Sequence, residues 1–318
     1  MKIRDYIPTR VGFGKGLKEA ADQMPGIIGL GADITGSVNM NFFAEAHPDR
    51  FYSLGIAEQN ITGVAAGLAL EGKIPVMATY GVFSAMRNTD QVRISVCYNN
   101  LHVIIGGAHA GISVGPDGAT HQALEDIAIM RALPNMTVLS PCDATQANQA
   151  IKAALTEQSG PVYLRFGREA VPDFMPDDIA FEIGKAQLLK DGADLTIVAT
   201  GHLVWEALEA AKALENGGVS TRVINLHTIK PIDKETLIKA SAETGAIVTA
   251  EEHQVMGGMG SAVAEVLSEN TPCPMKFIGV KDTFGESGQP GELMEKYKLK
   301  SKDIVKAAHE VLINKAKK

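Results

Sequence analysis

The most constraining feature of the sequence is the alternation of short apolar segments with amphipathic or small-residue segments along most of the chain. In the first half, segments typical of strands and helices follow one another at residues 27–33, 57–72, 75–81, 89–99, 101–107, 121–133, 136–141, 143–157 and 161–167. Asp143 is a suitable N-cap for the last of these helices. Strands that alternate with helices predict an α/β fold with a mostly parallel sheet and helices on both faces.

Residues 168–186 interrupt this alternation with two prolines and a cluster of acids, which is typical of a linker. A second series follows, with strand patterns at 194–202, 220–233, 246–253 and 274–280, helical patterns between them, and a last helix at 300–315. The 318 residues also suit about two domains of ordinary size. We therefore expect two α/β domains, residues 1–175 and 176–318.

Composition and charge exclude several classes of protein. The formal net charge of -7 is unlike that of a nucleic-acid-binding protein, which usually has a basic stripe. The cysteines, Cys97, Cys142 and Cys273, form no zinc pattern and indicate reduced thiols. The N-terminus lacks the apolar stretch of a signal peptide, and no apolar run approaches the ~20 residues that span a bilayer. We expect a soluble, cytoplasmic protein that binds neither nucleic acid nor membranes.

The segment HAGISVGPDGATHQ, residues 109–122, is the most distinctive local feature, and we call it the substrate loop. Three glycines and a proline disfavour regular structure there, and the preceding apolar run is typical of a buried strand. Polar side chains on such a loop commonly form a binding or catalytic site. His109, Asp117 and His121 could form a two-histidine, one-carboxylate metal site, but their irregular spacing favours contacts to a polar substrate.

Two acidic residues are further candidates, each with an ordinary structural alternative. Glu58 lies near the start of a helix, where the helix dipole by itself favours an acid. Asp33 follows a strand at the end where open α/β sheets bind ligands, although aspartate is also a common loop residue.

Arginines and glycines give weaker signals. Arg10, Arg165 and Arg168 lie near predicted loops and could bind phosphate or carboxylate groups, although surface arginines are common. Gly258-x-Gly260 precedes a helix, but it lies too far after the strand and lacks the third glycine of a dinucleotide-binding motif.

Four segments together resemble the transketolase family in order and approximate spacing: GADITGSVN, GIAEQN, HAGISVGPDGATHQ and RFGREAVP. The resemblance begins at PTR, residues 8–10, and continues through HTIKPID and AEEHQVMGGMGSAV in the second half. It implies a pyrimidine-binding domain followed by a transketolase C-terminal domain. We find no Gly-Asp-Gly…Asn motif, with which the family's diphosphate-binding domain holds a divalent ion.

The resemblance implies thiamine diphosphate as cofactor and gives four residues a role toward it. Glu58 matches the glutamate that hydrogen-bonds the aminopyrimidine ring and so favours removal of the thiazolium proton. Phe83 matches the aromatic residue that stacks on the pyrimidine. Asp33 and His121 match residues that line the cofactor beside the reacting carbon.

Substrate contacts are implied for five more residues. His109 and Arg168 match residues that bind the sugar phosphate, and Asp117 matches the partner of a substrate hydroxyl. Arg10 and Ser37 match two further phosphate contacts. Arg165 competes with Arg168, which is preferred because its distance to Pro172 reproduces the family's spacing.

The implied reaction moves a two-carbon ketol unit from a ketose phosphate to an aldose phosphate. A separate N-terminal subunit would hold Mg²⁺ or Ca²⁺, so we expect an α2β2 heterotetramer and little activity from this chain alone. Three alternatives stay open: a 1-deoxy-xylulose-5-phosphate synthase-like subunit, a 2-oxo-acid dehydrogenase β-like subunit, and a non-catalytic binding protein on the same fold.

Overall fold

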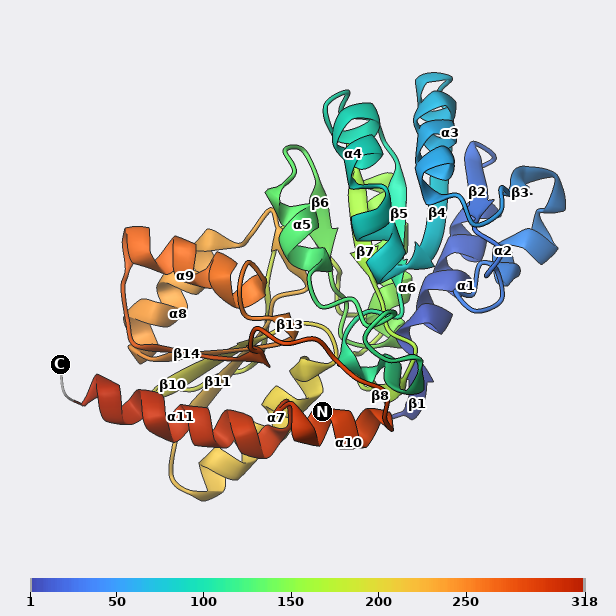
Figure 1. The fold of residues 1–318 in the computed structure, drawn as a ribbon. Coiled ribbons are helices and arrows are strands. Elements are labelled where there is room, and N and C mark those ends of the chain that lie inside the picture. The colour runs from blue at the N-terminus through green and yellow to red at the C-terminus, as the bar shows by residue number, and fades with distance from the viewer. Residues whose placement is uncertain (1, 317–318) are drawn as a thin grey trace.

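The computed structural model describes residues 2–316 and confirms an α/β protein with two mostly parallel sheets (Figure 1). The first sheet has the strand order β12-β6-β7-β5-β4-β2-β3. Its strands are β2 (Ile27–Gly31), β3 (Phe51–Ser53), β4 (Ile74–Tyr80), β5 (Ile104–Ala108), β6 (Thr137–Leu139), β7 (Val162–Arg165) and β12 (Thr228–Lys230). All neighbours are parallel except β12 and β6.

Helices cover both faces of this sheet because its strands are apolar on both sides. Successive strand residues point to opposite faces, and Ile27 and Ile28 accordingly enter different core clusters. One face packs against α1 (Thr9–Ala21), α2 (Asn41–Ala46) and α6 (Ala144–Thr156). The other packs against α3 (Glu58–Leu70), α5 (Asp126–Ala132) and the π-helices η2 (Phe83–Arg87) and η3 (Val92–Cys97), with the short α4 (Thr89–Gln91) between η2 and η3.

The helix boundaries agree with the sequence in some places and differ in others. Asp143 caps α6 as predicted, accepting a hydrogen bond from Gln146 N at 2.8 Å. The helix expected over 89–99 is mostly π-helical. The helix expected from His121 begins only at Asp126, because Gly111 N donates to Ala123 O and holds residue 123 in a β-bridge with Ala110.

The second sheet has the order β14-β13-β10-β11-β9, parallel except between β11 and β9. Its strands are β9 (Gln187–Lys190), β10 (Leu195–Ala199), β11 (Thr221–Asn225), β13 (Ile247–Gln254) and β14 (Met275–Val280). In Figure 1, α8 (Lys234–Thr244) and α9 (Met259–Asn270) lie on one side of it, and α7 (Leu203–Asn216) and α11 (Ser301–Lys315) on the other.

The segment expected to be a linker is only partly irregular. Its residues Ala170–Asp173 form β8, which pairs antiparallel with β1 (Asp5–Pro8). Phe174 and Met175 are buried, and their backbone N–H groups donate to the Asp143 carboxylate at 2.9 and 2.7 Å. The linker prediction was therefore wrong for residues 170–175: residues 170–173 pair with β1, and the side chains of Phe174 and Met175 enter the core cluster of the second domain while their backbone bonds to Asp143.

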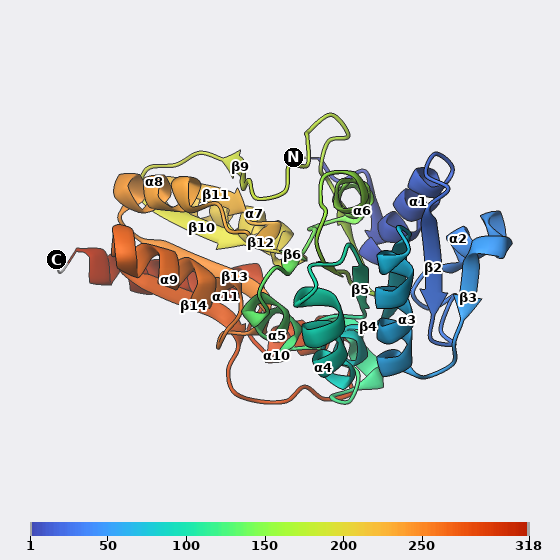
Figure 2. The ribbon, with the colours of Figure 1, turned by 90° about the horizontal axis from the view of Figure 1, so that it is seen from above.

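The two halves contact each other extensively. Strand β12, which comes from the second half of the sequence, forms the edge of the first sheet. Figure 2 shows the segment after β14 crossing toward the first domain before α10 (Pro290–Lys296) begins. No helix within residues 2–316 combines the length and apolar character needed to cross a membrane.

Candidate active site

The candidate residues gather at the carboxyl ends of parallel strands, where α/β sheets bind ligands. The residues Asp33 and Ser37 follow β2, Glu58 follows β3, Phe83 follows β4, His109, Asp117 and His121 follow β5, and Arg168 follows β7. Arg10 joins them from the first turn of α1, and its backbone N–H donates to Gly167 O at 3.3 Å.

Glu58 lies at the start of α3 with its side chain 1% exposed. Arg87 Nη1 donates to both of its carboxylate oxygens, at 3.1 and 3.0 Å. The same guanidinium lies over the Phe83 ring, with 4.0 Å between Arg87 Cζ and the ring centroid. The flat guanidinium of Arg87 therefore contacts a buried carboxylate and an aromatic face at the same time. The Arg87 side chain itself is 45% exposed.

Tyr80, at the end of β4, connects this group with the substrate loop. The Tyr80 ring centroid is 4.2 Å from that of His109 and 5.6 Å from that of His121. The ring centroids of His121 and Phe83 are 5.5 Å apart. The Tyr80 hydroxyl lies 3.0 Å from Ser37 Oγ, which is 3.4 Å from His109 Nε2. The aromatic side chains and Ser37 thus form one continuous polar and aromatic surface.

His109 is buried and has a left-handed backbone with φ 54°. Burial, together with the nearby charges of Arg10 and Arg168, lowers the pKa of its imidazole to about 3. The ring is therefore neutral near pH 7. Its Nδ1 and the Nε of Arg10 are buried without a hydrogen-bond partner among residues 2–316, so both could serve a ligand.

Two arginines flank His109 and give this end of the site a positive charge. Arg10 Nη1 donates to Ser37 O at 2.7 Å. Burial lowers the pKa of Arg10, and the charge of Arg168 acts in the same direction. Arg168 pairs with Asp117 at 2.8 Å, and the two side chains are 38% and 29% exposed. Such an arrangement suits an anionic group of a ligand.

Arg165, the competing arginine, lies elsewhere. It is buried, and its Nε pairs with Asp126 Oδ2 at 2.9 Å. Its Nη2 donates to Ala123 O and Glu252 O at 3.1 and 2.8 Å. These donors are used within the protein, so the geometry favours Arg168 over Arg165 as a ligand contact.

Asp33 is the candidate that the structure does not bring into contact with the others. It has a left-handed backbone, with φ 61°, and accepts a hydrogen bond from Ser53 Oγ at 2.9 Å. Its side chain is exposed at the rim, on the side of β3.

Sequence reasoning missed Tyr80 and Arg87. Tyr80 ends an apolar strand directly before a glycine. A tyrosine at the carboxyl end of a strand could have been recognised as a candidate ligand contact, because its hydroxyl is polar and ligands bind at that end. Arg87 follows Phe83 by four residues, a spacing that places the two on one side of a helical turn. Its contact with Glu58 depends on the approach of η2 to α3, which no local pattern reveals.

No group of three histidine, cysteine, aspartate or glutamate side chains within residues 2–316 is arranged to hold a metal ion.

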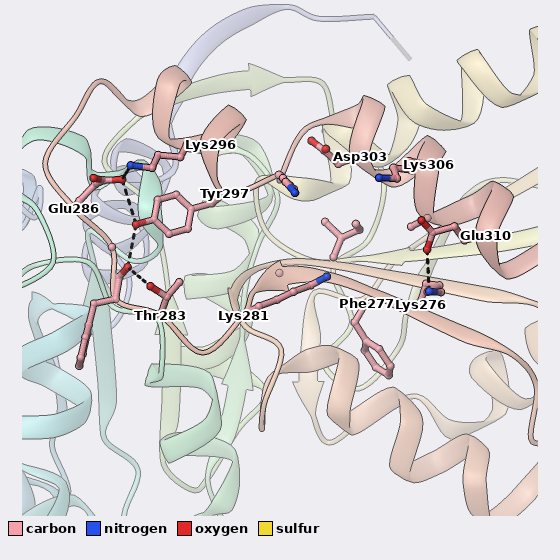
Figure 3. A pocket seen from close by; sticks show the side chains of 16 residues that line it. Lys276, Phe277, Lys281, Thr283, Glu286, Lys296, Tyr297, Asp303, Lys306 and Glu310 are labelled. Carbon is pink, nitrogen blue, oxygen red and sulfur yellow. Dashed lines mark hydrogen bonds and ion pairs between the residues drawn. The ribbon is translucent and has the colours of Figure 1, made fainter.

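A cavity of about 820 Å³ lies away from the candidate site, between β14 and α11 (Figure 3). Several of its charges are already paired, including Lys276 with Glu310 at 2.8 Å.

Comparison with known families and proteins agrees with this arrangement. Residues 5–173 match the family "Transketolase, pyrimidine binding domain", and residues 184–304 match "Transketolase, C-terminal domain". A 6-deoxy-6-sulfo-D-fructose transketolase subunit from Clostridium sp. strain MSTE9 is 44% identical over 93% of this chain and 91% of its own length. A subunit of the apulose-4-phosphate transketolase from Phocaeicola vulgatus is 41% identical over 96% of this chain and 98% of its own length.

A solved structure described as a split-gene transketolase, an inactive beta4 tetramer, superposes with a TM-score of 0.91. It is 50% identical, and the match covers 97% of this chain and 99% of that chain. The chain therefore belongs to the transketolase family and contains its pyrimidine-binding and C-terminal domains.

Proposed function

We propose that this chain is a subunit of a split transketolase that uses thiamine diphosphate to transfer a two-carbon ketol group from a ketose to an aldose phosphate. The observation that carries the proposal is the contact of one flat cation with both Glu58 and Phe83. An aminopyrimidine ring needs the same two partners: a carboxyl group at a ring nitrogen and an aromatic ring along its face.

The residues present therefore fit the pyrimidine half of the cofactor. The guanidinium of Arg87 is planar and protonated, and it makes both contacts at once. Because the Arg87 side chain is 45% exposed, it can turn toward solvent and leave Glu58 and Phe83 to the pyrimidine. Thiamine diphosphate, when bound, supplies the electron sink for breaking and forming the carbon–carbon bond.

The protein's own part is to bind and orient. Glu58 would hydrogen-bond a nitrogen of the pyrimidine and hold a proton there, and Phe83 would stack on the ring. His121, which contacts Phe83 and Tyr80, would line the cofactor, and Asp33 lies at the rim of the site. A histidine in this position could exchange a proton with a substrate hydroxyl.

The substrate contacts suit a ketose with an anionic end. Arg10, Arg168 and neutral His109 surround one region, Ser37 adds a hydroxyl, and Asp117 accepts from a sugar hydroxyl. The names of two relatives refer to a sulfo sugar and a sugar phosphate. We therefore assign a phosphorylated or sulfonated ketose as the donor and favour it over pyruvate.

We propose that the diphosphate and its Mg²⁺ or Ca²⁺ are bound by an N-terminal partner subunit, in an α2β2 assembly. Two relatives are named as subunits, and the superposed structure is a split-gene protein described as inactive. We place the complex in the cytoplasm, where the free thiols of Cys97, Cys142 and Cys273 would stay reduced.

The test is an assay of ketol transfer from xylulose 5-phosphate to ribose 5-phosphate, with thiamine diphosphate and magnesium. This chain is assayed alone and after co-expression with the N-terminal subunit; 6-deoxy-6-sulfofructose and pyruvate with glyceraldehyde 3-phosphate are alternative substrates. Transfer only in the co-expressed sample is expected. Turnover of pyruvate alone would favour the synthase-like alternative, and a stable complex inactive with every donor would favour a non-catalytic protein.

A further inference from the structure

The substrate loop lies against the C-terminal domain at its glycines. Gly111 has φ +89°, and a Cβ atom there would lie 2.3 Å from the carboxyl carbon of Glu252. Gly118 has φ +75°, and its Cβ would lie 2.5 Å from Ser287 Oγ. A larger residue at Gly111 would collide with the buried Glu252 side chain, and one at Gly118 would have to displace the Ser287 hydroxyl, so both glycines lie in close contact with the C-terminal domain.

Hydrogen bonds fix the same contact. Ser113 N donates to Glu252 Oε1 at 2.5 Å, and Gln122 Nε2 donates to Glu286 O at 2.9 Å. Figure 3 shows how the second contact is supported: Tyr297, directly after α10, extends toward the segment that carries Glu286, and its hydroxyl donates to Phe284 O at 2.9 Å. The loop between His109 and Gln122 is therefore bound to the C-terminal domain at two points.

Glu252 also reaches the other side of the site through His202. Glu252 Oε2 lies 3.2 Å from His202 Nδ1. The His202 ring packs on the backbone just before Arg168, since a Cβ at Gly167 would lie 2.3 Å from His202 Cε1. Burial raises the pKa of Glu252, but its interactions with His202, the charge of Arg165 and the hydrogen bond from Ser113 N together hold the pKa below its usual value.

Glu252 and His202 thus contact the two segments that carry the ion pair of Asp117 and Arg168. Ser113 is four residues before Asp117, and Gly167 directly precedes Arg168. We propose that Glu252, supported by His202, is a positioning residue that sets the separation of Asp117 and Arg168 and thereby the affinity for the anionic ketose. This inference rests on the proposed function and gives the C-terminal domain a direct part in substrate binding.

Glu251 provides a matched control. It is the neighbouring buried carboxyl of β13, but it faces the other side of the strand and accepts from Met259 N and Gly260 N at the start of α9, at 2.6 and 2.8 Å. A change there perturbs the C-terminal domain without touching the substrate loop. The experiment compares E252A, E252Q, H202Q and E251Q in the co-expressed complex.

Three quantities are measured for each variant: kcat and KM for the ketose donor, the Kd of thiamine diphosphate, and hydrogen exchange at the Ser113 amide. In E252A, kcat/KM should fall by about 10- to 100-fold, mainly through KM, because a misplaced binding group has an effect of that order. The Ser113 amide should exchange faster while the cofactor Kd stays within about twofold, since the cofactor contacts of Glu58 and Phe83 are untouched.

The conservative variants make the result specific. E252Q retains an oxygen acceptor for Ser113 N and should recover most of the lost affinity, while H202Q should raise KM less than E252A. E251Q should lower thermal stability and leave KM unchanged. Equal KM effects in E252A and E251Q would overturn the positioning role, as would an unchanged KM in E252A. An inactive wild-type complex would overturn the proposed function instead, and the Ser113 exchange rates would then still decide whether Glu252 holds the loop.

Discussion

Arg87 contacts the two residues to which the proposed function assigns the pyrimidine of the cofactor. Its Nη1 pairs with Glu58, and its guanidinium lies on Phe83, so under this proposal the pyrimidine and Arg87 compete for the same contacts. A buried carboxylate without a partner is unfavourable, so Arg87 stabilises the chain when the cofactor is absent. Binding of the cofactor would have to displace this interaction, which lowers the net binding free energy.

Replacing Arg87 should therefore strengthen cofactor binding. For R87M in the co-expressed complex we expect the Kd of thiamine diphosphate to fall about 3- to 10-fold, which corresponds to about 1 kcal/mol. R87K is the matched control, because lysine keeps the charge but loses the planar contact with Phe83. Isothermal titration measures both; weaker binding in R87M would show that Arg87 assists the cofactor.

Most candidate residues could be picked out from the sequence because each follows a predicted strand in the order of the family's motifs; their roles stay predictions. Tyr80 and Arg87 were not picked out, since their importance arises from contacts across elements. The glycines of Gly258-x-Gly260 were visible but have a different explanation. A Cβ at Gly258 would lie 2.3 Å from Glu251 Oε2, so this glycine makes room for a buried carboxylate rather than for a phosphate.

At the level of elements, Asp143 joins α6 to the segment after β8. It caps α6 through Gln146 N and also accepts from Phe174 N and Met175 N. The cap was predictable from the local pattern. The other two bonds were not, because they connect residues about 30 positions apart, and they explain why residues 174–175 pack rather than act as a linker.

Removing Asp143 should destabilise the fold. D143A leaves three backbone donors without their acceptor, and we expect a loss of about 2–4 kcal/mol. The matched variant is D233A at the cap of α8, where the carboxylate accepts from two backbone donors, Thr236 N and Ala186 N. Thermal unfolding followed by circular dichroism should show the larger Tm decrease for D143A. A smaller decrease than in D233A would be inconsistent with this role.

We propose the boundary between the domains after residue 175, although Gln149 of α6 still donates to Asp177 O and Ile179 O beyond it. A boundary drawn along the sequence does not separate the two sheets completely, because β12 comes from the second half of the chain and joins the first sheet.

The contacts of the substrate loop could also be predicted only in part. Its glycines and polar residues were evident, but the C-terminal domain that it contacts through Gly111 and Gly118 was not.

At the scale of the whole molecule, buried histidines make stability depend on pH. Burial lowers the pKa of His109 to about 3 and those of His227 and His253 to about 4. The unfolded chain binds protons at these groups below pH ~6.5, while the folded chain stays neutral there, so stability decreases as the pH falls. Burial raises the pKa of Glu251 to about 7, which opposes this trend by one proton.

The net difference of about two protons predicts that the free energy of unfolding falls by about 2–3 kcal/mol per pH unit between pH 6 and 5. Urea unfolding at several pH values measures this slope. In H227F, which can still stack on Phe181, the slope should decrease by about 1.4 kcal/mol per pH unit. A slope unchanged by this substitution would mean that His227 is not the neutral group described here.

The most direct measurement is the rate at which the thiazolium C2 proton of thiamine diphosphate exchanges with deuterium in the co-expressed complex. It is independent of the sugar substrate and, under the proposed function, depends on a hydrogen bond between Glu58 and the pyrimidine. NMR of the quenched cofactor gives the rate for wild type, E58A and E58Q, with bound cofactor measured in each. Exchange in E58A should be slower by about 10²- to 10⁴-fold while the folded complex still binds cofactor; an unchanged rate with cofactor bound would show that Glu58 does not activate it.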